Sequence, residues 1–215
     1  MTCNDEKKET FWSRHVEGYE GKQAFVCTPD IIDRVLTELR KETGLGHVLE
    51  LGCGTGLFTE ALIDSSSRIT ATDFSDEMVD EACNKRGDLD IVDFVKADGT
   101  CLQFDDDSFD TVFMANFIHL VDDPVSVVKE SYRVLKPGGK IIITSFAVDE
   151  MHLEARKAIV ERFVGTFGVP PRVKDRPRTT TVQDIVDLLV SSGFEMVRGD
   201  ILGLEVKSSY IVGKK

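Results

Sequence analysis

The sequence predicts an α/β fold in which a doubly wound, seven-stranded and mostly parallel sheet is covered by helices on both faces. Apolar runs typical of buried strands alternate with helical patterns along most of the chain. The last two runs are short and separated by few residues, which is typical of an antiparallel hairpin. With 215 residues, 41% of them hydrophobic, the chain is long enough to bury the core of one such domain.

The first expected element is a helix that begins at Pro29. Thr28 suits the N-cap position, and Pro29 suits the first helical position, where its missing N–H costs nothing. Apolar side chains then recur at helical spacing, at Ile31, Ile32, Val35, Leu36 and Leu39. Gly44 and Gly46 are expected to end this segment.

Five strands and their connections follow. The strands are expected at 47–51, 68–73, 91–98, 109–116 and 140–146. The first connection is expected to be a helix with apolar residues Leu57, Phe58, Ala61 and Leu62. A second helix is expected to open at Ser75, and a third to run from Asp123 to Leu135. The segment LKPGG at 135–139 predicts a turn before the fifth strand.

The pattern changes after the fifth strand. Residues 149–163 have a helical pattern, and the Gly-, Pro- and Arg-rich stretch 165–178 is typical of a loop. Thr181 with Asp184 three residues later is a capping-box pattern, which predicts a helix that ends at Ser192 and is closed by Gly193. The last two strands, expected at 194–202 and 208–214, should pair with each other.

Charge and composition exclude several function classes. The chain has 38 acidic and 26 basic residues and a net charge of −12, which opposes binding to a phosphate backbone, so we expect no nucleic-acid partner. The first residues lack an apolar signal-peptide core, and no apolar run is long enough to cross a bilayer. We therefore expect a cytoplasmic protein without membrane insertion. The five scattered cysteines show no metal-ligand spacing, so we expect free thiols and no metal site.

The strongest functional signal is the segment ELGCGTG at 50–56, directly after the first strand. The alternate glycines, Gly52, Gly54 and Gly56, allow a tight turn and leave no side chain where a ligand would lie against the backbone. The helix expected after this loop would offer unpaired N–H groups. A dinucleotide fingerprint would read GxGxxG, whereas here the third glycine falls one position early and Glu50 precedes the first by two.

Asp73 strengthens this signal. It closes the second strand, 73 − 52 = 21 residues after Gly52. A carboxylate at this strand end is placed to accept hydrogen bonds from both hydroxyls of a ribose. The alternative is a turn or helix N-terminal carboxylate, which is the commoner role of an isolated aspartate. The glycine loop in register with Asp73 favours ribose binding.

Four segments in this order resemble the motifs of class I S-adenosylmethionine-dependent methyltransferases. They are ELGCGTG at 50–56, TDFSDEM at 72–78, KADGTCLQFDDDSFD at 96–110 and LKPGGKIIIT at 135–144. The third is similar to the motif of small-molecule methyltransferases of ubiquinone and menaquinone biosynthesis, although Gln103 stands where many relatives have proline. The resemblance spans residues 46–145 and implies a Rossmann-like fold, S-adenosylmethionine as cofactor and S-adenosylhomocysteine as product.

The resemblance also implies the cofactor-binding residues around the glycine loop. Glu50 would lie near the methionine amino end of the cofactor, and Asp73 would hold its ribose. The cofactor would lie over the loop residues Gly52, Cys53, Gly54 and Gly56.

The remaining cofactor residues follow from the other motifs. Asp98 would accept a hydrogen bond from the adenine amine, with Gly99 adjacent, and Phe74 and Met78 would pack on the adenine face. Asn116, at the end of the fourth strand, would face the methionine part and the reaction centre. The alternatives are a turn aspartate for Asp98 and core packing for Phe74 and Met78.

Methyl transfer is an in-line displacement in which the protein aligns the reactants and excludes water. An oxygen or thiol acceptor usually needs a base. The candidates are His119, His15, His152 and Tyr19, of which His119 follows the fourth strand directly. The alternative for a histidine is a packed or surface side chain, which is its commoner fate.

The resemblance divides one domain, 1–215, into four parts. They are an N-terminal helical lid at 1–44, a cofactor-binding core at 45–146, an acceptor-side insertion at 147–180, and a C-terminal helix and hairpin at 181–215. Phe11, Trp12 and Tyr19 suit a lid, although hydrophobic docking of a first helix explains them equally well. The insertion contains a basic cluster, Arg172, Lys174, Arg176 and Arg178, which is more readily a solvated loop than an anion-binding patch.

Other functions stay open from the sequence alone. An NAD(P)-dependent oxidoreductase would share the sheet and Asp73, but the GxGxG spacing and the missing catalytic Tyr/Lys pair disfavour it. A non-catalytic S-adenosylmethionine-binding protein would use the same fold, and aminopropyl transfer is a weaker alternative. The expected partner is a small-molecule methyl acceptor whose reacting atom (O, N, S or C) is undetermined, and the chain is expected to be a monomer or homodimer.

Overall fold

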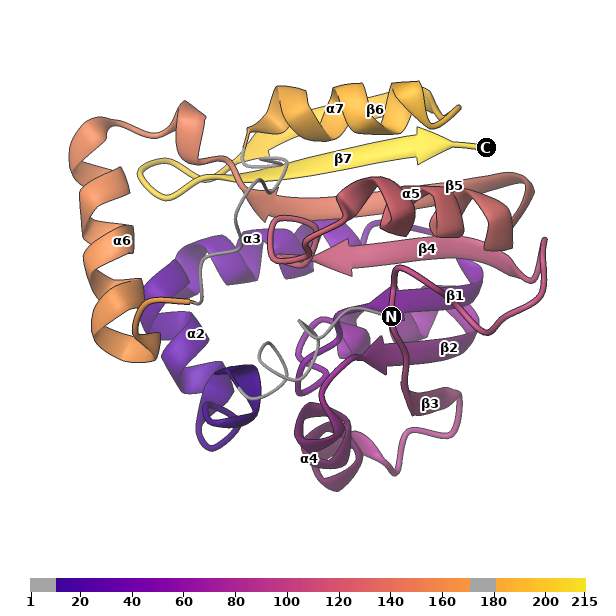
Figure 1. Ribbon diagram of the computed structural model, residues 1–215, viewed down its shortest axis with the longest axis horizontal. Helices are drawn as coiled ribbons and strands as arrows, with labels where there is room; N and C mark the ends of the chain where they lie inside the picture. Colours follow the sequence, from indigo (N-terminus) through magenta and orange to yellow (C-terminus); the bar gives the residue numbers. More distant parts are fainter. Residues whose placement is uncertain (1–10, 171–180) are drawn as a thin grey trace.

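The computed structural model describes residues 11–170 and 181–215 and contains the predicted seven-stranded sheet (Figure 1). The strand order is β3-β2-β1-β4-β5-β7-β6. The parallel part consists of β1 (Gly46–Leu51), β2 (Ser66–Asp73), β3 (Val92–Lys96), β4 (Phe109–Ala115) and β5 (Leu135–Phe146). The predicted C-terminal hairpin is confirmed, because β7 (Ser208–Lys214) pairs antiparallel with β6 (Glu195–Leu202) and also with β5.

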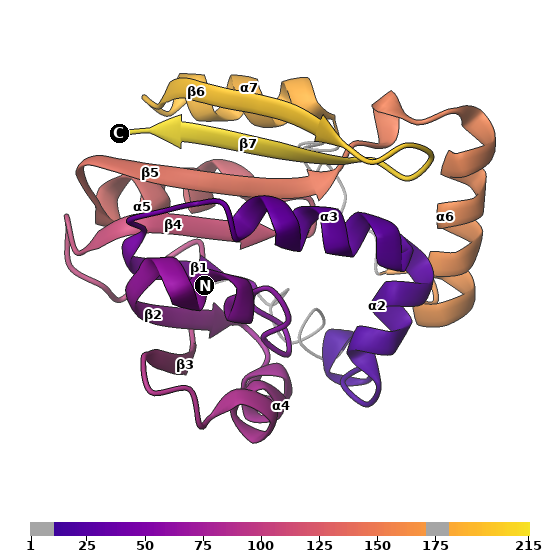
Figure 2. The same cartoon turned by 180° about the vertical axis from the view of Figure 1, so that it is seen from behind.

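Helices cover both faces of the sheet, as expected for a doubly wound fold. The helix α3 (Pro29–Leu39) and the 3₁₀ helix η1 (Thr59–Ser65) pack on one face, and α5 (Pro124–Val134) and α7 (Val182–Ser191) on the other (Figures 1 and 2). The helix α4 (Asp76–Arg86) packs beside β2 and β3. Two helices, α2 (Tyr19–Cys27) and α6 (Leu153–Phe167), lie beyond the carboxyl ends of the parallel strands (Figure 1). This arrangement leaves those strand ends facing α2 and α6.

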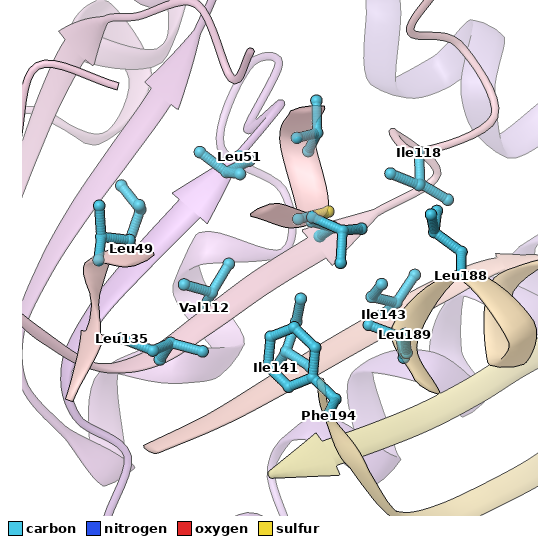
Figure 3. Packing of buried hydrophobic residues seen from close by; sticks show 14 of the residues in the cluster. Leu49, Leu51, Val112, Ile118, Leu135, Ile141, Ile143, Leu188, Leu189 and Phe194 are labelled. Atoms are coloured by element: carbon cyan, nitrogen blue, oxygen red, sulfur yellow. The ribbon is translucent and has the colours of Figure 1, made fainter. Parts of the chain in front are cut away.

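Strand alternation divides the core between the two faces. In β4, Val112 and Met114 belong to the cluster under α5 and α7, whereas Phe113 and Ala115 belong to the cluster under α3 and η1. Figure 3 shows part of the first cluster, in which Leu188 and Leu189 of α7 lie near Ile143 of β5. A third cluster joins α2, α3 and α6 and packs the two outer helices onto the rest of the molecule.

The connection after the glycine loop is not the α-helix predicted. The chain passes through turns and then forms the seven-residue 3₁₀ helix η1. Gly52, Gly54 and Gly56 all have left-handed backbone angles, with φ of 75°, 56° and 89°. A helical hydrogen-bond ladder cannot begin across such residues, so regular structure starts only at Thr59.

Three further predictions need correction. The segment LKPGG is not a separate turn but the start of β5, where the pairing with β4 shifts register. The helix expected at 149–163 lies at 153–167 and follows the short 3₁₀ helix η2 (Val148–Glu150). Thr28 occupies the N-cap position of α3, as predicted. However, its side chain makes no capping hydrogen bond, and its backbone φ is 69°.

By contrast, the capping box at the start of α7 is confirmed. The Thr181 hydroxyl accepts a hydrogen bond from Asp184 N at 3.0 Å, and Asp184 Oδ2 accepts one from Thr181 N at 3.0 Å. Within the ranges 11–170 and 181–215, no helix has the length and apolar character needed to cross a bilayer.

Candidate functional site

A cavity of about 1170 Å³ lies at the carboxyl ends of the parallel strands. Its wall is built from the segments that follow β1, β2, β3, β4 and β5, together with parts of α2 and α6. Open α/β sheets bind their ligands at this edge. The volume exceeds the roughly 300–1,000 Å³ of common small-molecule sites, so it can hold a nucleoside cofactor and a second small ligand together.

Most of the predicted site residues line this cavity. The predicted cofactor residues on its wall are Gly52, Cys53, Gly54, Asp73, Phe74, Met78, Asp98, Gly99 and Asn116. Two candidate bases, Tyr19 and His119, also line it. Two predicted residues, Glu50 and Gly56, are not on the wall.

The glycine loop presents bare backbone to the cavity. A Cβ atom added at Gly54 would lie 3.5 Å from the ring of Tyr19, and one added at Gly52 would lie 2.3 Å from Phe117 Cδ2. Only glycine therefore allows Phe117 to lie against the loop at Gly52. At Gly54 the ring of Tyr19 lies close to the bare backbone, so the loop and Tyr19 together form one side of the cavity.

Gly56 has a different role, because it faces the core. A Cβ atom there would lie 2.8 Å from Arg86 Cδ, and the φ of 89° disfavours other residues. We expect Gly56→Ala to lower the free energy of unfolding by about 2 kcal/mol, since left-handed strain and overpacking each cost about 1 kcal/mol or more. Urea unfolding measures this change.

Gly165→Ala is the matched control for that variant. Gly165 lies inside α6, and nothing lies within 4 Å of an added Cβ atom. This substitution should be neutral or stabilise the protein by up to about 1 kcal/mol. Equal effects of the two substitutions would contradict the packing role of Gly56.

Asp73 links the glycine loop to the start of α4. Its Oδ2 accepts a hydrogen bond from Gly54 N at 2.9 Å, and its Oδ1 accepts one from Ser75 N at 3.0 Å. Burial raises the pKa of this carboxyl, and the backbone donors of Ser75 and Gly54 counteract the rise. Asp73 thus accepts the backbone hydrogen bonds of a turn carboxylate and also lies on the cavity wall.

Asp98 is held in the same way after β3. Its Oδ1 accepts hydrogen bonds from Thr100 N at 2.8 Å and from the Thr100 hydroxyl at 2.7 Å. Phe74 and Met78 complete this side of the cavity, and Met78 is buried. Two carboxylates held by backbone hydrogen bonds and two apolar side chains on the same cavity wall suit a ligand with polar edges and an apolar ring face.

Asn116 is the residue whose environment most directly indicates a ligand. Its backbone has φ of 51°, which is uncommon for a residue other than glycine, and its buried Oδ1 has no hydrogen-bond partner. Buried polar atoms are almost always satisfied, and strained backbone gathers at ligand sites. Because Asn116 lines the cavity, a ligand that donates a hydrogen bond there would satisfy this oxygen.

The two candidate bases differ in their surroundings. His119 Nδ1 lies 3.0 Å from the Ser145 hydroxyl, which orients the imidazole on the cavity wall. Tyr19 lies deep in the site, where burial and the nearby charge of Asp73 raise the pKa of its phenol. The phenol therefore stays protonated near neutral pH, which disfavours Tyr19 as a base.

Glu50 lies behind the glycine loop, where the side chain is 1% exposed. It accepts a hydrogen bond of 2.6 Å from the Thr59 hydroxyl. Burial raises the pKa of Glu50 to about 7, against the opposing effect of the Thr59 hydrogen bond.

Several residues of the site gave no signal in the sequence. Phe117 lies between Gly52 and Gly99, and Thr55 joins the cavity wall to Arg86 through its carbonyl oxygen. Phe117 has the pattern of an ordinary core residue, and Arg86 that of a cation at a helix end. Their roles depend on contacts between distant segments, which no local spacing encodes.

The part of the wall formed by α6 and the N-terminal residues is mainly apolar. It includes the aromatic side chains Phe11, Trp12 and Phe163, and Phe146 at the end of β5 also lines the cavity. Among the described residues that line the cavity, four are aspartates and none is lysine or arginine. The basic cluster Arg172, Lys174, Arg176 and Arg178 lies outside the described residues.

Known proteins resemble this chain in its central region. Residues 49–143 match the family model described as a methyltransferase domain. A demethylmenaquinone methyltransferase from Clavibacter sepedonicus is 40% identical over 110 residues, 51% of this chain and 45% of that protein. A phosphatidylethanolamine N-methyltransferase from Cereibacter sphaeroides is 35% identical over 127 residues, 57% of this chain and 62% of that protein. The chain thus spans about half the length of these curated relatives.

The fold is also similar to that of solved structures. A methyltransferase from Thermotoga maritima, described as SAM-dependent and as a possible histamine N-methyltransferase, superimposes with a TM-score of 0.72. The superposition covers 96% of this chain and 99% of that chain at 24% sequence identity. At this identity the similarity supports the fold and not a shared acceptor.

Proposed function

We propose that the chain is a class I S-adenosylmethionine-dependent methyltransferase that transfers a methyl group from S-adenosylmethionine to a small-molecule acceptor, because residues 49–143 match a methyltransferase domain and its relatives include a demethylmenaquinone methyltransferase. The observation that carries this proposal is the unsatisfied Oδ1 of Asn116 on the wall of a large cavity at the strand ends. When bound, S-adenosylmethionine supplies a methyl group already activated by a sulfonium.

The residues of the cavity fit this cofactor. Asp73 would accept hydrogen bonds from the ribose, and Asp98 one from the adenine amine. Phe74 and Met78 would pack on the adenine face, and Asn116 Oδ1 would accept a hydrogen bond from the methionine part. The loop at Gly52 and Gly54 is compatible with this placement, because it lines the cavity without side chains.

Glu50 has a different role in this proposal from the one the resemblance implies. Its carboxyl group bonds to Thr59 and does not line the cavity, so it supports the glycine loop from behind. The loop backbone and Asn116 then remain to receive the amino acid end of the cofactor.

The acceptor in this proposal is a neutral molecule with an apolar part. Aromatic side chains on the wall suit an apolar body, and the aspartates on the described wall would repel a carboxylate or phosphate. Of the acceptors in the names of the two curated relatives, demethylmenaquinone is uncharged and fits this wall, whereas phosphatidylethanolamine carries a phosphate. His119, oriented by Ser145, is the candidate base for an acceptor that must lose a proton.

Calorimetry followed by an acceptor screen tests the proposed function. We expect the protein to bind S-adenosylhomocysteine and not NADH, and to release S-adenosylhomocysteine from S-adenosylmethionine when given neutral phenols, quinols, thiols or amines. Anionic members of the same panel should react more slowly, because the described lining residues include no cation.

Two results would overturn the proposal. Binding of NADH without binding of S-adenosylhomocysteine would favour an oxidoreductase. Binding of S-adenosylhomocysteine without turnover of any acceptor would favour a non-catalytic binding protein.

A further inference from the structure

Arg86, the last residue of α4, joins three segments that are distant in the sequence. Its side chain is 8% exposed, and its Nη1 donates hydrogen bonds to Thr55 O and to Glu20 Oε1, both at 2.8 Å. Its Nε lies 2.8 Å from Glu60 Oε1. A buried guanidinium needs such partners, and removing one of them leaves an uncompensated charge.

Glu20 and Thr55 complete this network. Glu20 is the second residue of α2, and its Oε1 also accepts a hydrogen bond of 2.9 Å from the Thr55 hydroxyl. Thr55 thus binds Arg86 through its carbonyl oxygen and Glu20 through its hydroxyl. Tyr19, next to Glu20, is the residue that lies over Gly54, so the placement of its ring depends on where Glu20 is held.

The same segment also touches the other end of α4. The Ser13 hydroxyl donates to Glu77 Oε2 at 2.6 Å and lies 3.0 Å from the Ser75 hydroxyl. We call residues 11–27 the cap. The cap therefore contacts α4 at its start through Ser13 and at its end through Glu20, and both Trp12 and Tyr19 of the cap line the cavity.

These two contacts differ in strength. The contact of Ser13 with Glu77 is exposed, and exposed polar pairs contribute little. The contact of Glu20 with Arg86 involves a buried guanidinium and charge-assisted hydrogen bonds, which are about twice as strong as neutral ones. The contact of Glu20 with Arg86 is therefore the stronger of the two polar contacts between the cap and α4.

We propose that Arg86 is a positioning residue that, through Glu20, fastens the cap over the cofactor half of the cavity and so sets how long the cofactor stays bound. This inference rests on the function proposed above. Tyr19 lies against the loop at Gly54 and Trp12 also lines the cavity, so in this proposal the cap covers one side of the cofactor half and must move for the cofactor to leave. Breaking the contact between Glu20 and Arg86 is part of the barrier to that movement.

The fluorescence of Trp12 can report movement of the cap. Trp12 is the chain's only tryptophan, and it lies in the cap against Tyr19 and Phe167. Its fluorescence should change when S-adenosylhomocysteine binds, and a displacement experiment in a stopped-flow instrument then gives the dissociation rate. We expect Glu20→Gln, which keeps the size and loses the charge, to raise this rate about tenfold. Glu17→Gln, an exposed acidic residue of the same segment, is the matched control and should change nothing.

A double-mutant cycle separates positioning from general structural support. Glu20→Gln and Arg86→Gln remove the same contact, so their effects on the dissociation rate should not add in the double variant. Fully additive effects would show that Arg86 does not act through Glu20, and wild-type dissociation in Glu20→Gln would overturn the proposal outright.

Quenching of Trp12 by acrylamide tests the cap without any ligand. Quenching should be stronger in Glu20→Gln than in the wild type and in Glu17→Gln. If the wild type does not bind S-adenosylhomocysteine, the proposed function fails, and the quenching comparison still decides whether Glu20 holds the cap.

Should Glu20→Gln fail to fold, Glu20→Asp is the substitute variant. It retains the charge but shortens the reach to Arg86, and it should also raise quenching. Unchanged quenching in that variant would contradict the proposal.

Discussion

Replacing Asp73 with alanine should weaken the binding of S-adenosylhomocysteine by roughly 100-fold or more. The ribose would lose two hydrogen bonds to a charged acceptor, each of which contributes about 1.5–3 kcal/mol, and every 1.4 kcal/mol is tenfold in affinity. Calorimetry measures the change. Asp76→Ala is the control, because Asp76 is an exposed residue three positions along that pairs with Lys96, and its loss should change the affinity less than about twofold.

Asp73 also holds the loop through Gly54 N and Ser75 N, so a second measurement must isolate its contact with the ribose. The 2′-deoxy analogue of S-adenosylhomocysteine provides it. The analogue should bind the wild type about tenfold more weakly than the parent compound, and Asp73→Ala should not distinguish the two ligands. Equal discrimination in the variant and the wild type would show that Asp73 only shapes the loop.

The gain in free energy of unfolding of Glu50→Gln over the wild type should be small at pH 5 and large at pH 8. Burial raises the pKa of Glu50 to about 7 from its ordinary value of 4.5. Between these values the folded protein binds more protons than the unfolded chain, so the free energy of unfolding of the wild type falls as the pH rises from about 4.5 to about 7 and levels off above that. Glutamine does not titrate, and its oxygen can still accept the hydrogen bond from Thr59.

The difference between variant and wild type should therefore grow to about 3 kcal/mol at pH 8, since one pKa unit corresponds to about 1.4 kcal/mol. Urea unfolding at pH 5, 6, 7 and 8 measures it. Glu195→Gln, at an exposed position of β6, should follow the wild-type profile. Parallel profiles for Glu50→Gln and the wild type would mean that Glu50 ionises freely in the folded protein.

The residues that were predicted well owe their structure to nearby sequence. The capping box of Thr181 and Asp184 forms within one helical turn, and the strands follow from the alternation of apolar residues. The placement of Asp73 and Asn116 on the cavity wall follows almost as directly, because both stand at carboxyl ends of parallel strands.

Local patterns predicted two features poorly: the type of helix that follows the glycine loop and the residue at which α6 begins. The connection after the glycine loop has helical spacing of apolar residues, yet it is the 3₁₀ helix η1, because three left-handed glycines delay regular structure until Thr59. The start of α6 was misplaced by four residues, 153 − 149, since no strong N-cap signal marks it.

The sequence by itself determined the α/β class, the order of the elements and the strand ends at which a ligand can bind, because periodicity and glycine spacing are local properties. Only the tertiary structure decided which side chains meet at that edge. It placed Glu50 behind the loop and away from the cavity, set Phe117 against Gly52, and buried Arg86 between Glu20 and Thr55. These contacts join residues up to 66 positions apart, and their energies arise from burial and charge pairing that exist only after the chain has folded.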